Sequence, residues 1–280
     1  MVGSLQGLIK RQRQTKKTPS TGLLAAHIRL LVALAHLPSP PAPPPRILSI
    51  ARRYTSVVPT DTSVWLARLH AESAYGTADS VADAWSTARR AVPTCSEIWL
   101  WGADRCCPKP SSSYWEAFDG LLAESMCDAA LRGVHESLLL RVAEAIGGLA
   151  SAAERRARVE HVAKRCLPSA RVWARVFAAL TGAAGAAREE EDEGLVREVY
   201  ECWRGTGEVE EATLAWARWL LCCKGRGDEA VRVIERARGS GGQSTSGAGS
   251  LAERWAAIMR GQEGDDSGDV ESGFGNGGEW

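Results

Sequence analysis

Apolar residues recur along most of this chain at the three- and four-residue spacing of amphipathic α-helices. Between Ala78 and Val92, for example, Val81, Ala84 and Trp85 lie on one helical face. No stretch shows the strict alternation of a half-buried strand, so the sequence predicts an all-α fold. The expected helices begin or end at Gly, Pro, Ser, Thr or Asp residues and cover 23–37, 65–74, 78–92, 97–105, 114–131, 136–146, 152–167, 171–180, 195–204, 209–223 and 228–238.

A short phrase recurs along these helices: Ala, then Arg or Lys, then Arg, with a Pro shortly afterwards and a tryptophan five or six residues beyond it. The copies are Ala88–Pro93 before Trp99, Ala163–Pro168 before Trp173, and a weaker Ala51–Tyr54 with Pro59 before Trp65. Trp65 and Trp99 are 34 residues apart, and Trp99 and Trp173 are 74 residues apart, which is about two such periods. A fixed period of this length predicts an α-α superhelix, a TPR-like solenoid of antiparallel helix pairs.

A helix pair of this length has little interior of its own, so it buries its apolar face against the neighbouring pairs. We expect a large aromatic residue on the first helix to face small residues on the second, and a proline to end the pair. The expected packing positions are Trp65, Trp85, Ala88, Pro93, Trp99, Ala163, Pro168, Trp173, Phe177, Trp216, Trp219 and Ala230.

The same positions resemble the HAT (half-a-TPR) repeat family. Its first helix carries Trp and a second large residue, and its second helix carries an Ala/Arg-rich signature. The matching first helices are Trp65/Leu69/Glu72, Trp99, Trp173/Phe177 and Trp216/Trp219, and the matching second helices are 88–93, 163–168 and 229–238. The resemblance implies a non-enzymatic protein scaffold in RNA processing, most of all in ribosomal RNA maturation. Its implied partners are protein subunits of a ribonucleoprotein, with small nucleolar or ribosomal RNA in second place, in the nucleus and nucleolus.

Charge and composition divide the chain into three parts. Residues 1–60 hold nine Lys or Arg and no acid, whereas the remainder carries a net charge of minus nine. We expect 1–45 to be a basic, Pro-rich arm with one amphipathic helix, and 46–238 to be the repeat domain. Residues 239–280 contain 12 of the 28 glycines and are expected to form a disordered tail, in which only 251–260 could form a transient helix. The arm fits a nuclear address or a mitochondrial transit peptide, and the second would make the chain a mitochondrial RNA-binding repeat protein.

A run of basic residues between 154 and 175 is the candidate RNA contact. Two interpretations stay open, a backbone-binding patch and a solvated helix face, and the second is favoured because Arg is the usual polar residue of this sequence. The cations considered are Arg155, Arg156, Arg158, Lys164 and Arg165.

Other chemistry receives little support from the sequence. The eight cysteines include two adjacent pairs but no CxxC spacing, so we expect reduced thiols and no metal site. Gly225-x-Gly227-x-x-Ala230 fits a loose dinucleotide-binding pattern, but it follows a helix, so a turn between helices is expected. We therefore expect no catalytic residues, cofactor, small-molecule substrate or membrane span. A generic TPR-like adaptor that binds peptides is the main alternative function.

Overall fold

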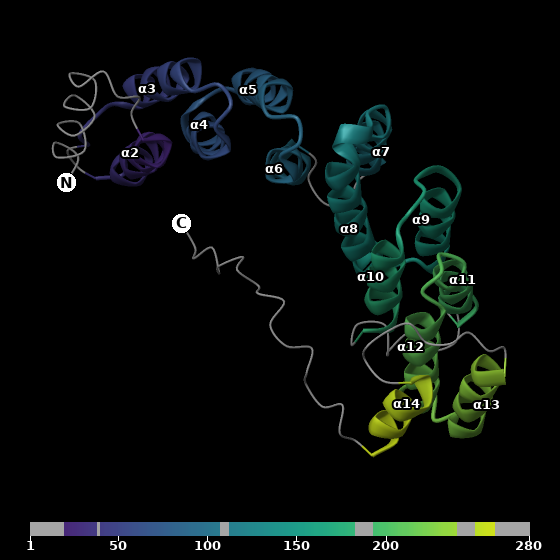
Figure 1. The fold of residues 1–280 in the computed structure, drawn as a ribbon. Helices are drawn as coiled ribbons and strands as arrows, with labels where there is room; N and C mark the ends of the chain where they lie inside the picture. The colour runs from purple at the N-terminus through teal and green to yellow at the C-terminus, as the bar shows by residue number, and fades with distance from the viewer. Residues whose placement is uncertain (1–19, 38–39, 107–111, 183–192, 240–249, 261–280) are drawn as a thin grey trace. The chain divides into compact units, whose positions relative to one another are not determined.

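A computed structural model gives the fold and describes residues 20–37, 40–106, 112–182, 193–239 and 250–260. Within these ranges every regular element is a helix and none is a strand (Figure 1). The prediction of an all-α fold made of helices packed against their neighbours in the chain is therefore confirmed. The chain divides into two compact units, Met1–Val142 and Ala143–Trp280, and each is described by itself.

Helices α2 to α6 of the first unit form two layers, with α2, α4 and α6 in one and α3 and α5 in the other (Figure 1). Helix α4 contacts α2, α3, α5 and α6, so it is the centre of this unit. The elements are α2 (Thr21–Leu34), α3 (Pro44–Val57), α4 (Thr62–Tyr75), α5 (Ala78–Ala91), α6 (Ser96–Cys106), α7 (Ser112–Met126) and η1 (Ala129–Leu131), after which α8 (Arg132–Gly148) continues across the boundary.

Local capping explains where several helices begin. The Asp61 carboxylate accepts a hydrogen bond from the Val64 amide at the start of α4. Thr77 and Ser80 form a reciprocal capping box at the start of α5. Helix α3 begins at Pro44, inside the proline run. Proline is tolerated there because the amide N–H that it lacks would have no partner in the first turn of a helix.

The first helix belongs to the core of the unit and not to a separate arm. Leu24, Ile28 and Leu31 of α2 are fully buried in one hydrophobic cluster with Ile47 of α3 and Val64 of α4. The boundary expected at residue 45 is therefore corrected, because the apolar face of α2 packs on α3 and α4 across the proline run. Residues 1–19 of the expected arm lie outside the described residues.

The six-residue interval between proline and tryptophan has a direct cause. The indole nitrogen of Trp65 donates a hydrogen bond to the Pro59 carbonyl at 2.6 Å, and Trp99 donates to the Pro93 carbonyl at 2.8 Å. Both indoles are buried, so each polar N–H must find a partner there. In the third copy the interval is five residues, and Leu167, which precedes the proline, has a φ of 46°.

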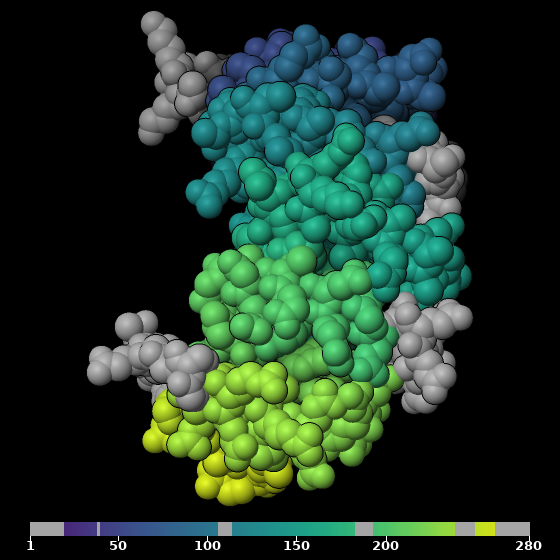
Figure 2. All heavy atoms as spheres, turned by 90° about the vertical axis from the view of Figure 1, so that its right-hand side faces the viewer, coloured from purple at the N-terminus to yellow at the C-terminus, as the bar shows by residue number. Residues whose placement is uncertain are grey.

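The second unit also forms two layers, with α10, α12, α14 and the end of α8 in one and α9, α11 and α13 in the other (Figure 1). Figure 2 turns the layer of α9, α11 and α13 toward the viewer and shows their side chains following one another along the unit. The bounds are α9 (Ala152–Arg165), α10 (Ala170–Thr181), α11 (Glu193–Arg204), α12 (Val209–Cys222), α13 (Gly227–Gly239) and α14 (Leu251–Met259).

Helix α14 lies where at most a transient helix was expected, and its packing corrects the expectation of a disordered tail for residues 250–260. Leu251 and Trp255 are buried, and α14 contacts both α12 and α13. Arg254 donates two hydrogen bonds, of 2.6 and 3.0 Å, to the Glu211 carboxylate on α12. The packed part of this unit therefore extends past residue 238, while 240–249 and 261–280 lie outside the described residues.

The expected packing positions differ in their burial. Trp85 is half-buried, Pro93 is exposed, and Ala163 and Pro168 are half-buried. Pro93 and Pro59 contribute through their main-chain carbonyls, so their rings need no burial. The buried positions are Trp65, Ala88, Trp99, Trp173, Phe177, Trp216, Trp219 and Ala230.

Candidate functional site

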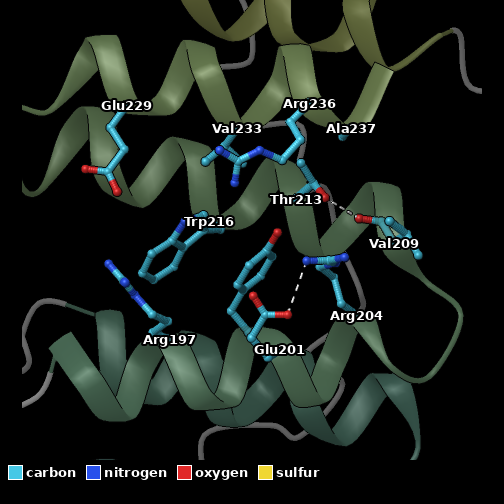
Figure 3. A pocket seen from close by; sticks show the side chains of 11 residues that line it. Arg197, Glu201, Arg204, Val209, Thr213, Trp216, Glu229, Val233, Arg236 and Ala237 are labelled. Atoms are coloured by element: carbon cyan, nitrogen blue, oxygen red, sulfur yellow. Dashed lines mark hydrogen bonds and ion pairs between the residues drawn. The ribbon is translucent and has the colours of Figure 1, made fainter. Parts of the chain in front are cut away.

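Two hollows lie in the second unit, and α12 lines both of them. The first, which we call the arginine hollow, lies between α11 and α13 and has a volume of about 200 Å³ (Figure 3). The second, which we call the apolar hollow, lies between α10, α12 and α14 and has a volume of about 460 Å³. Trp216 lines the first and Trp219 lines the second, so the two tryptophans expected on this helix serve different surfaces.

Two stacked aromatic rings line the arginine hollow. The rings of Tyr200 on α11 and Trp216 on α12 lie 5.1 Å apart with an interplanar angle of 13°. Trp219, one helical turn further along α12, lies 4.9 Å from Trp216 between ring centroids. Both rings are buried, so together they form a rigid apolar lining of the hollow.

Charged side chains surround this aromatic surface. Figure 3 shows Arg197 next to Trp216, Arg204 paired with Glu201, and Arg236 reaching in from α13. The Arg197 guanidinium lies 5.8 Å from the Trp216 ring and the Arg204 guanidinium lies 5.7 Å from the Tyr200 ring, both within cation–π range.

Glu201 and Glu229 also line this hollow, so its lining contains three arginines and two carboxylates. Because these charges nearly cancel, the hollow suits the mixed polar and apolar surface of a protein partner better than it suits a highly charged anion. Arginine and large aromatic residues are the side chains that dominate binding energy at protein interfaces.

The apolar hollow has a different lining. Phe177, Leu214 and Trp219 contribute apolar surface, and Trp203 packs on Phe177 with ring centroids 5.9 Å apart. The Trp203 indole nitrogen is buried and has no hydrogen-bond partner among the described residues.

Two exposed thiols, Cys222 and Cys223, edge the apolar hollow. Partial burial raises the pKa of Cys223 above its usual range, and the neighbouring Cys222 raises it further. This thiol is therefore protonated at neutral pH, whereas a nucleophilic cysteine needs a depressed pKa.

The cations expected to contact RNA do not form one free basic patch. Arg155 is buried, and its guanidinium donates to the Leu149 and Ala150 carbonyls at 2.6 and 3.0 Å, so it stabilises a turn. This corrects its assignment as a surface cation. Arg156 is paired with Glu198 at 2.7 Å and Lys164 with Glu160 at 3.1 Å, while Arg158 is half-buried and Arg165 is exposed.

Arginines of the repeated phrase pair with carboxylates of neighbouring helices. Arg52 donates two hydrogen bonds, of 2.8 and 3.0 Å, to Glu72, which is fully buried. Arg89 lies 4.5 Å from the Trp85 ring and 4.9 Å from the Trp99 ring, and it pairs with Glu124. These arginines connect helices of the first unit, so the phrase has a packing role.

Sequence reasoning missed most of the arginine hollow. The apolar spacing around Tyr200 predicted a helix at 195–204, but it did not show that Tyr200 would stack on Trp216 of the next helix. The Gly225–Gly227 segment does join two helices as expected: Gly225 has a φ of 64°, and the Arg226 amide donates to the Leu220 carbonyl.

Among the described residues, no group of three or more His, Cys, Asp or Glu side chains is placed to hold a metal ion. Nor does any helix in the described ranges have the length and apolar character needed to cross a membrane. No model of a known protein family matches the chain, and no curated protein matches it. The function is therefore argued from the sequence pattern and from the site.

Proposed function

We propose that the chain is a non-enzymatic helical-repeat scaffold that binds protein subunits of an RNA-processing assembly. The observation that carries the proposal is the pair of hollows on α12, in which Trp216 and Trp219 meet arginines and apolar side chains. Such surfaces hold the side chains of another protein by desolvation, stacking and hydrogen bonds. Neither hollow needs a cofactor or a small-molecule substrate for this role.

The assignment to RNA processing rests on the resemblance to HAT repeats. The closing pattern, from Trp216 through Gly225 to Ala230, resembles the C-terminal part of U3 small nucleolar RNA-associated protein 6. We therefore propose a role in ribosomal RNA maturation and small-subunit biogenesis, within a small nucleolar ribonucleoprotein in the nucleolus. Partner proteins are the principal ligands and RNA contacts are secondary.

A TPR-like peptide adaptor is the second candidate. It is favoured by the apolar hollow, which opens between three helices of one layer and has the volume of a pocket that takes a bulky side chain. The two candidates differ in their partners. An adaptor binds peptides without any link to RNA, whereas a ribonucleoprotein scaffold co-purifies with assembly factors and RNA.

The test is purification of a tagged full-length chain from its own cells, with and without ribonuclease, followed by mass spectrometry and fluorescence localisation. The proposal expects nucleolar signal and small-subunit assembly factors, some of which stay bound after ribonuclease treatment. Diffuse cytoplasmic signal with chaperone-type partners would support the adaptor. Mitochondrial import would support the organellar RNA-binding protein and overturn the nucleolar role.

A matched pair of variants tests whether the apolar hollow binds these partners. Ala178→Trp places an indole at the exposed edge of the hollow, whereas Ala157→Trp places one on α9, away from both hollows. We expect Ala178→Trp to reduce recovery of at least one partner by about tenfold or more, because losing a hot-spot contact costs about 2 kcal/mol. Ala157→Trp should leave recovery unchanged, and both variants should keep the helical circular dichroism signal.

A further inference from the structure

A row of cationic and aromatic side chains crosses the layer of α2, α4 and α6 in the first unit. Its members are Arg29 on α2, His70 on α4, and Trp101 and Arg105 on α6. The His70 and Trp101 rings meet edge to face with centroids 6.1 Å apart, and the Arg105 guanidinium lies 5.8 Å from the Trp101 ring. Helix α4 contacts both α2 and α6, and the three helices lie in one layer (Figure 1), with Arg29 and Arg105 on the two helices that flank the helix of His70.

The positive charge of the row meets no pairing carboxylate in the part of the chain that the structure describes. Among the described residues, neither Arg29 nor Arg105 forms an ion pair, and both are exposed. The one acid next to Arg105 in sequence, Asp104, is bound by Arg141. Helix α2 brings no acid, because the first acidic residue of the chain is Asp61.

The ionisation of His70 reports the same electrostatic environment. Partial burial lowers the pKa of His70 below its usual value, and the charges of Arg105 and Arg29 lower it further. Both arginines therefore lie close enough to His70 to act on it. An anion that bound here would gain from these two charges without displacing a carboxylate.

The tryptophan of the row has a hydrogen-bond donor that the described residues leave unpaired. Trp101 is half-buried, and its indole nitrogen has no hydrogen-bond partner among the described residues. Trp85 and Trp99 of the same unit donate instead to the Ile98 and Pro93 carbonyls. Trp101 thus has a partly accessible ring, while its unpaired indole nitrogen is buried.

We propose that this row binds single-stranded RNA, with Arg29 and Arg105 on backbone phosphates and Trp101, beside His70, stacking on a base. Aromatic rings set between cations are the arrangement by which proteins hold single strands without reading their sequence. Neighbouring helix axes lie about 8–10 Å apart, so a row over three helices spans about 16–20 Å, which is room for more than one nucleotide. The binding itself follows from the row alone, and only the source of the RNA rests on the proposed function.

An acidic peptide is the rival occupant, because it would also be attracted by two arginines. The aromatic residues favour RNA, since a base gains from stacking on Trp101 while a glutamate side chain has no ring to stack. The arginine hollow of the second unit contrasts with the row, because its arginines stand against Glu201 and Glu229.

The test measures binding of a fluorescent oligouridine to the purified full chain by anisotropy over a series of salt concentrations. The variant Arg29→Gln/Arg105→Gln removes both unpaired cations. Its matched control is Arg46→Gln/Arg53→Gln, which removes two exposed arginines of α3 in the other layer and changes the net charge equally. We expect the row variant to reduce the salt slope of log K by about 1.4, at about 0.7 for each phosphate contact of a single strand, and the control to leave the slope unchanged.

Trp101→Leu tests stacking separately, with circular dichroism to verify the fold. We expect it to weaken oligouridine binding by about 5- to 150-fold, which corresponds to the loss of one stacked base. Equal binding by the row variant and its control would overturn the proposal, and so would Trp101→Leu binding as tightly as the unmodified chain. Poly-glutamate that binds as tightly and competes for the row would show an acidic-peptide site and overturn the RNA assignment. If oligouridine binds at the row but no assembly factor co-purifies from cells, the RNA site stands and the proposed scaffold role fails.

Discussion

The indole N–H of Trp99 donates to the main-chain carbonyl of Pro93, six residues earlier, at 2.8 Å. Trp65 and Pro59 repeat this relationship at 2.6 Å, one period earlier in the chain. The tryptophan thereby ties the first helix of a pair to the turn that precedes it, while its ring fills the core. The repeated six-residue interval between proline and tryptophan therefore corresponds to a repeated hydrogen bond between them.

This arrangement predicts unequal effects at its two partners. Trp99→Ala should lower the free energy of unfolding by about 3–5 kcal/mol, the usual cost of deleting a buried large aromatic side chain. Pro93→Ala should change it by no more than about 1 kcal/mol, because the carbonyl acceptor is retained and the ring is exposed. Urea unfolding measures both, and equal losses would show that the proline ring, and not its carbonyl, holds the tryptophan.

A close contact between Trp85 and Gly102 gives a second prediction. A Cβ atom at Gly102 would lie only 1.8 Å from the Trp85 ring, whereas one at Gly120 of α7 would meet nothing within 4 Å. Gly102→Ala should therefore destabilise the chain by about 1–3 kcal/mol through overpacking. Gly120→Ala should stabilise it by about 0.5–1 kcal/mol, because alanine suits a helix interior better than glycine. Thermal melts of both variants provide the comparison.

The double variant Trp85→Ala/Gly102→Ala completes this test. Removing the indole removes the clash, so the cost of adding a methyl group at Gly102 should largely disappear in the Trp85→Ala background. The two substitutions should then be strongly non-additive, as expected for side chains in direct contact. Simple additivity would place the cause of the Gly102→Ala effect elsewhere than in Trp85.

The packing of α2 predicts that residues before the proline run matter for stability. Ile28→Ala should lower the free energy of unfolding by about 2–5 kcal/mol, because Ile28 is fully buried between α2, α3 and α4. Leu37→Ala should change it by less than about 0.5 kcal/mol, because half of that side chain is exposed. An Ile28→Ala loss as small as that of Leu37→Ala would restore the separate arm that the proline run suggested.

The pattern of apolar residues predicted the helices other than α3 and α14 with ends within a few residues, because the amphipathic pattern of a helix is a local property of the sequence. It could not show which faces meet. The proline run looked like a boundary, yet Leu24 and Ile28 pack across it onto Val64. The glycine-rich composition around α14 likewise hid the burial of Trp255 and the pairing of Arg254 with Glu211.

The candidate sites were harder to predict, because they depend on which residues of different helices meet. A basic run in the sequence drew attention to Arg155, which the fold buries. The row of Arg29, Trp101 and Arg105 gave no local pattern, since its members are spread over more than 70 residues of sequence. The missing acids of residues 1–60 were the one sequence feature that bears on it.

The buried carboxylate of Glu72 predicts how stability depends on pH. Burial acts to raise its pKa, but hydrogen bonds from Arg52 and Ser80 and the charges of Arg52 and Arg68 outweigh it, so the pKa lies below the usual 4.5. A carboxyl group with a depressed pKa in the folded state stabilises the fold above its unfolded pKa. That contribution is lost as the pH falls below 4.5 and through the folded pKa.

Glu72→Gln should therefore be less stable than the unmodified chain at neutral pH, by about 1–3 kcal/mol, since Arg52 is half-exposed and solvent screens part of the interaction. The two unfolding free energies should converge as the pH falls, because the unmodified carboxyl group is then protonated as well. Glu160→Gln is the control: its pair with Lys164 is exposed on both sides and should be worth less than about 0.5 kcal/mol at any pH. Urea unfolding at a series of pH values measures the gap. A gap between Glu72→Gln and the unmodified chain that stays constant down to acid pH would mean that the charge of Glu72 contributes nothing, and that its shape alone holds Arg52 and Ser80 in place.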